Sequence, residues 1–280
     1  MPEGPEVANL AEELNFYLTD RTVIGIDILG GPMSRHGIPE GVERLKKSLP
    51  LTVREVEYRG KLIIFKIDGW WAFSTLGMSG GWYLHHRKHS HIRLRLQPEG
   101  EGPLYPDEIY FSDPRCFGTF DATDRESVYL ERRDRIRPGF LGKYRLSLEE
   151  WKKNVNKHRK KNICKSLMDQ TLIIGGIGNY LLSEILHRAG VSPWIKWSDL
   201  SNEKIESLYE VSEKTITHSY DTRGASIENY RSMTGEEGES TFYFMVYGQE
   251  EDEEGNEVVS VTGPHGRTLW ISSKYPWTKP

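Results

Sequence analysis

The chain has 280 residues, of which 37% are hydrophobic and 28% charged, so it is long enough to bury two cores. It contains no apolar run of the roughly 18 residues that a membrane span needs, and no basic region followed by an apolar stretch at its start. We therefore expect a soluble protein that is not exported. Its two cysteines form no CxxC motif and suit a reducing compartment, while the net charge of −4 argues mildly against a DNA-binding protein.

The N-terminal half is predicted to form one helix followed by many short strands. Apolar residues at positions 7, 10, 11 and 14 give residues 5–17 the periodicity of a helix with one buried face. Apolar runs, several separated by Gly, Pro and Asp, then predict strands at 23–29, 51–58, 62–67, 70–75, 82–85, 91–96 and 109–111. We expect residues 1–135 to form a β-sandwich or flattened barrel with the helix along its edge.

The C-terminal half is predicted to be helical except at its end. The charged segment 124–141 ends in Pro-Gly and indicates a linker, with residues 136–145 as the connection between domains. Helical patterns follow at 148–158, 163–169, 180–189 and 202–219, within a predicted domain of residues 146–225. The final segment, residues 240–280, is predicted to contain a hairpin across 250–264. The fold class is therefore α+β with two domains.

The first six residues, Met-Pro-Glu-Gly-Pro-Glu, carry the most specific chemistry. Removal of Met1 makes Pro2 a terminal secondary amine, and α-amino groups titrate near about 8, so a modest downward shift of the pKa gives a neutral nucleophile. A secondary amine that attacks a sugar C1′ forms an iminium that cannot lose its charge by losing an N–H proton. The carboxylate of Glu3 could manage protons beside it. The alternative to a catalytic role is that Pro2 is simply a common second residue and that Pro5 is a proline in the first turn of the helix.

The distribution of charge indicates a phosphate-binding surface. Positive charge gathers at residues 152–153 and 157–161, and negative charge at 250–254. The basic run precedes the glycine-rich loop 175–179, which lies between two predicted helices with Asn179 expected to open the second. Glycines let the backbone approach a phosphate, and the N–H groups of a helix start bind anions. A solvated basic face and an ordinary interhelical turn would each explain one part of this pattern.

Several short motifs, taken in order, resemble one family. Besides the opening, they are residues 58–61, 76–80, 113–118, 168–170, 176–180, 246–248 and 266–268. In this order they resemble the formamidopyrimidine-DNA glycosylase/endonuclease VIII family of base-excision repair enzymes over nearly the whole chain, and Gly4 is more similar to the endonuclease VIII branch. The resemblance implies a catalytic β-sandwich in residues 1–135, a DNA-binding helix–two-turns–helix in 146–225, damaged DNA as the partner, and a monomer.

The resemblance assigns three residues to the space that an everted nucleotide leaves. Met78, flexible and apolar between glycines, is suited to wedging between bases. Arg115 and Phe117 would point the same way on an extended tip, where the first could bond the orphaned base and the second could stack in the gap. Taken singly, Met78 and Phe117 would more often be core residues. The consequence of Cys116 within this motif is open.

The resemblance also assigns contacts with the DNA backbone. Lys61 follows a glycine at the start of a predicted strand and is expected to contact the phosphate beside the lesion and to help elimination, although a solvated lysine at a strand end is the alternative. His89 and His91 alternate onto one face of a strand, but without a third ligand nearby they do not indicate a metal. DNA contacts are further implied for His89, Arg159, Lys165 and Asn179. Glu184 resembles a family acid near the sugar, with a position on the helix surface as the alternative.

The end of the chain departs from the commoner family pattern. Many members carry a zinc finger of four cysteines there, whereas no cysteine follows Cys164, which excludes a thiolate zinc site. The segment resembles the zincless finger of some eukaryotic and viral endonuclease VIII-like enzymes, with Trp270, Ile271 and Tyr275 available to pack the hairpin. Arg267 stands where the family grips the phosphates that flank the lesion.

The implied activity is that of a bifunctional DNA glycosylase/AP lyase acting on oxidised pyrimidines and on ring-opened or further-oxidised purines. Pro2 would attack C1′, Glu3 would shuttle a proton to the leaving base, and β- and δ-elimination, helped by Lys61 and Arg267, would cut the strand. No cofactor and no metal are expected.

Two alternatives to this activity stay open. The first is a catalytically silent protein that binds damaged DNA, and the second is a module that binds RNA. The expected location is inside the cell, in the nucleus or at the site of viral DNA replication for a eukaryotic or viral protein. Residues 226–239 are expected to contribute to the lesion pocket.

Overall fold

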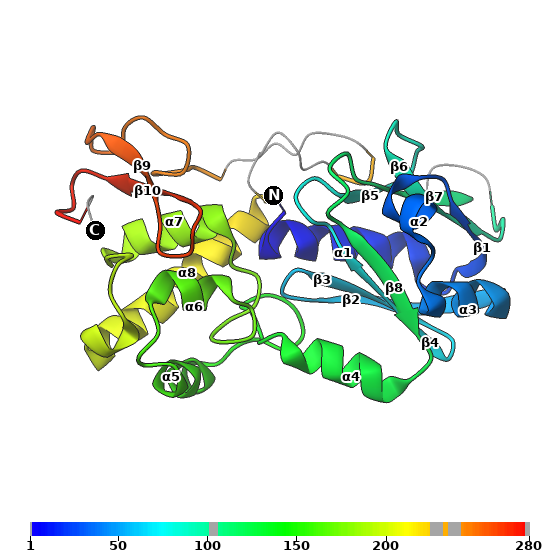
Figure 1. Cartoon of the computed structure of the whole chain (residues 1–280), viewed down its shortest axis with the longest axis horizontal. Helices are drawn as coiled ribbons and strands as arrows, with labels where there is room; N and C mark the ends of the chain where they lie inside the picture. Colours follow the sequence, from blue (N-terminus) through cyan, green and yellow to red (C-terminus); the bar gives the residue numbers. More distant parts are fainter. Residues whose placement is uncertain (1, 101–105, 225–231, 235–241, 278–280) are drawn as a thin grey trace. The chain divides into compact units, whose positions relative to one another are not determined.

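The computed structural model describes residues 2–100, 106–224, 232–234 and 242–277 (Figure 1). It consists of two compact units. The first contains Met1–Pro2, Glu6–Arg135 and Arg223–Ser240, and the second contains Glu3–Pro5, Ile136–Thr222 and Thr241–Pro280. Residues 3–5 therefore belong to the unit that holds the C-terminal half of the chain. Among the described residues, no helix has the length and hydropathy needed to cross a membrane.

The first unit is built on one antiparallel sheet, with its strands in the order β5-β7-β6-β1-β2-β3-β4-β8. The strands are β1 (Thr22–Ile28), β2 (Leu51–Arg59), β3 (Leu62–Ile67), β4 (Trp70–Thr75), β5 (Gly81–Tyr83), β6 (Ser90–Leu96), β7 (Glu108–Ser112) and β8 (Thr119–Thr123). Strands β1 and β2 share only two register pairs, so this junction is a corner between two four-stranded layers. The predicted β-sandwich is confirmed.

Two tight hairpins set the register of β2, β3 and β4. Ile67 pairs with Trp70 across Asp68-Gly69, and Gly69 has a φ of +69°, which suits the Asp-Gly turn of a two-residue hairpin. Arg59 pairs with Leu62 across Gly60-Lys61, and Gly60 has a φ of +58°. Lys61 therefore stands in the turn that directly precedes β3.

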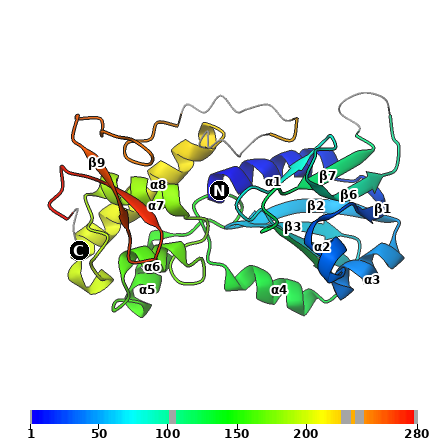
Figure 2. The ribbon, with the colours of Figure 1, turned by 45° about the horizontal axis from the view of Figure 1, so that its top comes forward.

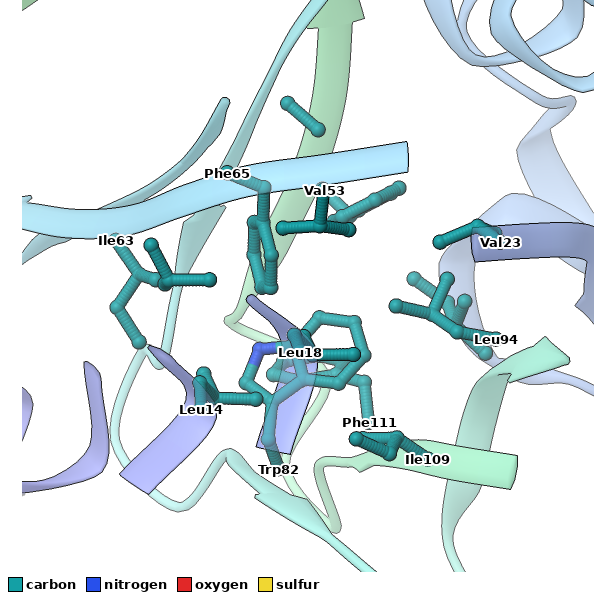
Figure 3. Packing of buried hydrophobic residues seen from close by; sticks show 14 of the residues in the cluster. Leu14, Leu18, Val23, Val53, Ile63, Phe65, Trp82, Leu94, Ile109 and Phe111 are labelled. Atoms are coloured by element: carbon teal, nitrogen blue, oxygen red, sulfur yellow. The ribbon is translucent and has the colours of Figure 1, made fainter. Parts of the chain in front are cut away.

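The core of this unit lies between the two layers. Helix α1 (Gly4–Leu18) contributes Val7, Leu10, Leu14 and Leu18, each at most 1% exposed. Figure 3 shows side chains of α1 packed among residues from both layers, with Leu14, Leu18, Phe65, Trp82, Ile109 and Phe111 at its centre. The predicted leading helix is confirmed, and its apolar stripe fills the interior of the sandwich.

Strand β8 and three further helices were not predicted: α2 (Gly31–His36), α3 (Glu40–Ser48) and α4 (Glu126–Arg135). Helix α4 occupies part of the segment predicted to be a linker, so that prediction was wrong there. The many charged residues of α4 gave no sign that two of its side chains pack on β4. Tyr129 stacks on Trp71 with ring centroids 5.2 Å apart, and Arg132 lies 4.6 Å from the centre of the Phe73 ring.

The second unit contains the four predicted helices. They are α5 (Leu148–Lys157), α6 (Ile163–Met168), α7 (Asn179–Ala189) and α8 (Asn202–Asp221), with a 3-10 turn η1 at Trp197–Asp199. Ser147, Asn162 and Ser201 cap α5, α6 and α8 through their side chains. Helices α6 and α7, with the turns at 169–178 between them, form the predicted helix–two-turns–helix.

The C-terminal hairpin lies further along the chain than predicted. It is formed by β9 (Val258–Thr262) and β10 (Thr268–Ser272), which pair in register, rather than by residues 250–264. The acidic stretch before β9 instead forms a compact turn with a single bridge, Glu251 to Glu257, because the side chain of Asp252 binds the turn from inside. Figure 2 shows β10 beside α7, and we call residues 242–277 the finger.

Candidate active site and nucleic-acid interface

The chain start is fastened to the helix–two-turns–helix by Glu3. Its side chain is 1% exposed and accepts backbone N–H groups from Gly178 (2.6 Å), Tyr180 (2.9 Å) and Leu181 (3.3 Å). These donors belong to the first turn of α7 and to the residue before it, where unpaired N–H groups and the helix dipole favour an anion. Glu3 therefore caps a helix that begins 176 residues later, and Pro2, which is buried, immediately precedes this anchor.

Glycines make this docking sterically possible. A Cβ added to Gly178 would stand 2.2 Å from Cδ of Glu3, and one added to Gly4 would stand 3.1 Å from Cα of Gly176. The N–H of Gly4 donates to the carbonyl of Gly176 at 2.8 Å, which adds a backbone tie. The glycine-rich loop thus receives the chain start at close range.

Asn179 begins α7, as expected, but does not cap it; Gly178 holds the cap position and the carboxylate of Glu3 supplies the acceptor. The freed amide of Asn179 reaches the finger instead. Its Nδ2 donates to the carbonyl of Thr268 at 2.8 Å, and its Oδ1 lies 3.1 Å from Nε2 of His265. The start of α7 is therefore joined to the tip of the hairpin that carries Arg267.

Tyr247 completes this cluster. Burial and the nearby charge of Glu3 raise the pKa of the Tyr247 phenol, while a hydrogen bond with Asn179 acts in the other direction. Tyr247 and His265 were not among the predicted site residues. Tyr247 lay within one of the matched motifs, whereas only contacts across the chain place His265 here.

Glu184 accepts hydrogen bonds from the backbone of the first part of the finger. Its carboxylate is fully buried and accepts the backbone N–H groups of Met245 (3.1 Å), Val246 (3.0 Å) and Tyr247 (2.9 Å). Arg188, one helical turn on, pairs with the same carboxylate and donates to the carbonyl of Tyr243. A position on the helix surface is therefore wrong for Glu184, which clamps the segment that leads into the hairpin.

A second carboxylate organises the finger turn. Asp252 accepts hydrogen bonds from the hydroxyl of Ser272 (2.6 Å), from the backbone and amide of Asn256 (2.9 and 3.0 Å) and from the backbone of Glu254 (3.0 Å). Among the described residues there is no group of three or more His, Cys, Asp or Glu side chains placed to hold a metal. The Asp252 network occupies the finger turn and ties it to β10.

The acid sensitivity of the finger is expected to depend on Asp252. Burial acts to raise its pKa, but hydrogen bonds from Ser272 and Asn256 hold it at about 2, below the ordinary 3.8. A lowered folded-state pKa gives stability that is present above the unfolded value and lost as the pH falls from about 3.8 through about 2. Asp252→Asn should therefore remove part of the acid-induced loss in this window, measured as the difference between the wild-type and variant unfolding free energies at pH 6 and pH 3. Equal pH dependence in the two proteins would contradict this role.

The end of the finger is pinned to α7 and to the residues after it by aromatic side chains. Tyr275 donates its hydroxyl to the carbonyl of His187 at 2.8 Å and stacks on Trp277, with ring centroids 4.3 Å apart. The indole N–H of Trp194 donates to the carbonyl of Trp277 at 3.0 Å, and Ile271 is 5% exposed. Tyr275 and Ile271 thus stabilise the finger, as the sequence suggested.

The basic residues of this unit lie on and around α5 and α6. Lys165 is exposed on α6, whose N-terminus Asn162 caps by accepting the Lys165 backbone N–H. Arg159 is partly buried, and within the described part of the chain its guanidinium nitrogen Nη1 has no hydrogen-bond partner. Lys152 is in an exposed ion pair with Glu206 at 2.6 Å, so part of the predicted patch is neutralised within the chain.

In the first unit, one buried carboxylate assembles the predicted void-filling residues. Asp113 is 0% exposed; it accepts from the Ser79 hydroxyl (2.7 Å) and from the backbone N–H groups of Arg115 (3.2 Å) and Gly118 (2.7 Å). A Cβ on Gly77 would stand 2.6 Å from the backbone of the opposite loop, so the loop of Met78 and the loop of Phe117 touch directly. The two motifs form one surface, which we call the double loop (residues 76–80 and 113–118).

Arg115 and Phe117 are neighbours on the double loop, but not by the expected geometry. Residue Cys116 between them has a φ of +59°, so the segment is a turn rather than an extended tip. Its consequence is that the Arg115 guanidinium lies 5.6 Å from the centre of the Phe117 ring, which is 58% exposed. An exposed phenyl ring held by a cation is an arrangement for contact with a partner, not for packing in a core.

Three further residues surround the double loop. The thiol of Cys116 lies 3.5 Å from Nη2 of Arg35 and 3.8 Å from Nε2 of His91, so His91 is turned toward the loop. His89 has an exposed side chain, and its carbonyl accepts the N–H of Asp113 at 3.0 Å. His89 is thereby held next to the double loop.

Comparison with known proteins agrees with this architecture. Residues 1–120 match the model of the formamidopyrimidine-DNA glycosylase N-terminal domain, and residues 144–231 match that of its H2TH domain. A formamidopyrimidine-DNA glycosylase of Desulfitobacterium hafniense is 30% identical, with 89% of each chain covered. The Lactococcus lactis enzyme bound to DNA with an AP site is 25% identical, with a TM-score of 0.77 and 96% and 97% of the two chains covered. Its complex with DNA that contains an oxidised pyrimidine is also 25% identical, with a TM-score of 0.78 and 97% and 98% covered.

A β-sandwich, a helix–two-turns–helix that receives the chain start, and a finger define a DNA glycosylase of the helix–two-turns–helix class. More specifically, the chain belongs to the formamidopyrimidine-DNA glycosylase family. It is thus a DNA glycosylase/AP lyase that binds damaged DNA.

Proposed function

We propose that this enzyme excises oxidised pyrimidines and ring-opened or further-oxidised purines through a Schiff base on Pro2, and then cuts the strand by β,δ-elimination. The observation that carries the proposal is the anchoring of Glu3 by three backbone N–H groups at the start of α7. This anchor fixes the residue next to Pro2, so the amine and a carboxylate are held together at the chain start.

The chemistry follows from these two groups. The nitrogen of processed Pro2 forms a bond to C1′, the bond between C1′ and the base breaks, and the electron pair leaves with the base, which gains a proton that Glu3 passes on. The Pro2 nitrogen loses its N–H proton, the C1′–O4′ bond then breaks, and O4′ takes up a proton. The opened sugar carries an iminium at C1′, which makes the C2′ proton acidic. Loss of that proton expels the 3′ phosphate, and a second elimination expels the 5′ phosphate. Hydrolysis then releases the sugar fragment from Pro2.

The remaining candidate residues serve to hold the DNA. Cationic and amide groups at Lys61, His89, Arg159, Lys165, Asn179 and Arg267 are proposed to contact the backbone, with Lys61 and Arg267 also assisting elimination. Met78, Arg115 and Phe117 are proposed to fill the gap in the duplex. The exposed ring of Phe117, held over Arg115, supports this role.

We further propose that the finger works without metal, as in the zincless endonuclease VIII-like branch. The support is the absence of cysteine after Cys164, together with the Asp252 network and the aromatic contacts of Tyr275. The preference for pyrimidines is supported by the similarity to an enzyme solved with DNA that contains an oxidised pyrimidine. Most of the residues expected to contribute to the lesion pocket, 226–239, lie outside the described residues.

Borohydride trapping tests the proposal directly. Processed protein is mixed with a duplex that carries one oxidised pyrimidine, reduced with borohydride, and digested for mass spectrometry. We expect a covalent DNA adduct on the peptide that begins with Pro2. The matched control is the same protein with an N-terminal extension that blocks the proline nitrogen, which should bind the duplex but give no adduct. Strand cleavage by the blocked protein, or trapping at a lysine instead of Pro2, would reject the mechanism.

A further inference from the structure

We propose that His265 is a positioning residue that orients Arg267 by fastening the tip of the finger to the first residue of α7. The inference rests on the proposed role of Arg267 in holding phosphate. It starts from the contact between Nε2 of His265 and Oδ1 of Asn179, 3.1 Å apart. These atoms link the turn that precedes Arg267 to the helix that Glu3 caps.

The orientation of the Asn179 amide determines the state of the histidine. Its Nδ2 faces the carbonyl of Thr268 at 2.8 Å, and only an N–H donor is favourable there. Oδ1 must therefore face His265, and Nε2 of His265 must carry the proton that it donates. The other ring nitrogen, Nδ1, is buried and has no hydrogen-bond partner among the residues that the structure describes. A second proton on the ring would bury an unpaired N–H group beside a guanidinium, so the ring is neutral.

The turn is shaped to receive this ring. A Cβ on Gly263 would stand 2.6 Å from Cε1 and 2.7 Å from Nδ1 of His265, so only glycine leaves room for it. The N–H of Gly263 donates to the carbonyl of Arg267 at 2.8 Å, and the N–H of Gly266 donates to the carbonyl of Gly263 at 2.9 Å. The ring therefore packs inside a closed turn whose last residue is Arg267. Burial, followed by the charge of Arg267, lowers the pKa of His265, in agreement with a neutral ring.

The contact between His265 and Asn179 helps to determine where Arg267 points. Its side chain is exposed, so no packing fixes its direction, and the position of its backbone depends on the turn. Asn179 binds the turn at two points, before Arg267 through His265 and after it through Thr268. Loss of the first point leaves the turn held on one side only. The guanidinium would then sample more directions, and its contact with phosphate would weaken without any loss of the residue itself.

The test is a double-mutant cycle with the full chain on a duplex that carries an abasic site, with dissociation constant and single-turnover cleavage measured separately. We expect His265→Ala to weaken binding or slow cleavage about 5- to 10-fold, the value of one hydrogen bond. His265→Gln, whose amide N–H can reach Asn179, should restore most of the loss. His265→Ala combined with Arg267→Ala should be no worse than Arg267→Ala alone, because the histidine acts through the arginine. Thr262→Ala, an exposed change on β9, is the matched control.

Two kinetic outcomes overturn the proposal: effects of the single variants that multiply in the double variant, and a Gln variant as impaired as the Ala variant. A readout independent of activity is the nitrogen chemical shifts of the His265 ring, which should report a neutral ring protonated at Nε2 at pH 7. Protonation at Nδ1 would also overturn it. Borohydride trapping of the wild type at Pro2 separates this failure from that of the proposed chemistry, since trapping persists if only the role of His265 is wrong.

Discussion

Glu3→Gln is expected to lower the rate of base excision by at least about 100-fold, the usual contribution of general acid–base catalysis, while cleavage of a pre-formed abasic site falls by less than about 10-fold. The difference arises because departure of a base requires a proton, whereas an abasic site has already lost its base. Pro2 can still form the iminium in the variant. The two reactions therefore separate proton transfer from nucleophilic attack.

The structure also predicts a cost to stability. The Glu3 carboxylate accepts three backbone N–H groups through both oxygens. Glutamine keeps one oxygen and turns an NH2 group toward at least one of these donors, which leaves a buried N–H unpaired at about 1–3 kcal/mol. We expect the variant to unfold at a lower temperature than the wild type but to remain folded at 25 °C.

The measurement uses single-turnover kinetics with enzyme in excess, on a duplex with an oxidised pyrimidine and on the same duplex with an abasic site. Glu12→Gln is the matched control, since Glu12 is exposed on α1, the helix that directly follows Glu3. An equal loss on both substrates would mean that Glu3 acts only by placing Pro2. No loss on either would remove Glu3 from the mechanism.

The parts of the fold that the sequence predicted well are those specified by local patterns. Strands β3 and β4 were predicted with their observed bounds, because apolar runs are separated there by Asp-Gly and preceded by Gly-Lys. Helices α5 to α8 were found within about two residues at each end, because side-chain caps and periodicity agree. Helix α4 was missed because its buried face is narrow, with Tyr129 as its buried residue, and the rest is charged.

The candidate site shows the limit of local patterns more clearly. The sequence named Glu3 and Asn179 but not their partners, because those of Glu3 lie 175 or more residues away and those of Asn179 lie 86 and 89 residues away. Asp113, which assembles the double loop, and Glu184, which clamps the finger, are acids whose roles exist only after folding brings backbone N–H groups to them. His265 had no signal in the sequence beyond its place two residues before Arg267. Buried polar contacts between distant segments leave no periodicity to detect.

Glu184→Ala is expected to have the largest effect on stability of any single change considered, a loss of about 3–5 kcal/mol in the free energy of unfolding. The wild-type carboxylate is fully buried and serves three backbone N–H groups as well as Arg188. Removing it leaves those three donors without an acceptor, one of them the buried N–H of Val246, and opens a cavity inside the unit. Arg188 is 19% exposed, so its guanidinium can turn partly to solvent, whereas the buried N–H of Val246 cannot.

The same contacts predict which segments of the Glu184→Ala protein lose stability. The segment that loses its acceptor is Met245 to Tyr247, which leads into the hairpin and contains the phenol near Asn179. Amide hydrogen exchange should therefore accelerate at residues 245–247 and in β9 and β10 before it changes in the β-sandwich. DNA cleavage should fall along with it, because Arg267 stands on that hairpin.

Thermal unfolding followed by tryptophan fluorescence, with hydrogen exchange by mass spectrometry, measures both effects; the melting temperature should fall by roughly 10 °C. Glu206→Ala is the matched control: it removes a glutamate from α8 of the same unit, but from an ion pair that is 42% exposed on both sides, where a loss of about 0–1 kcal/mol is expected. Arg188→Ala should lie between the two, because it leaves the carboxylate with its three backbone donors. A Glu184→Ala protein that melts with the Glu206→Ala control would show that the finger is held by its aromatic contacts alone.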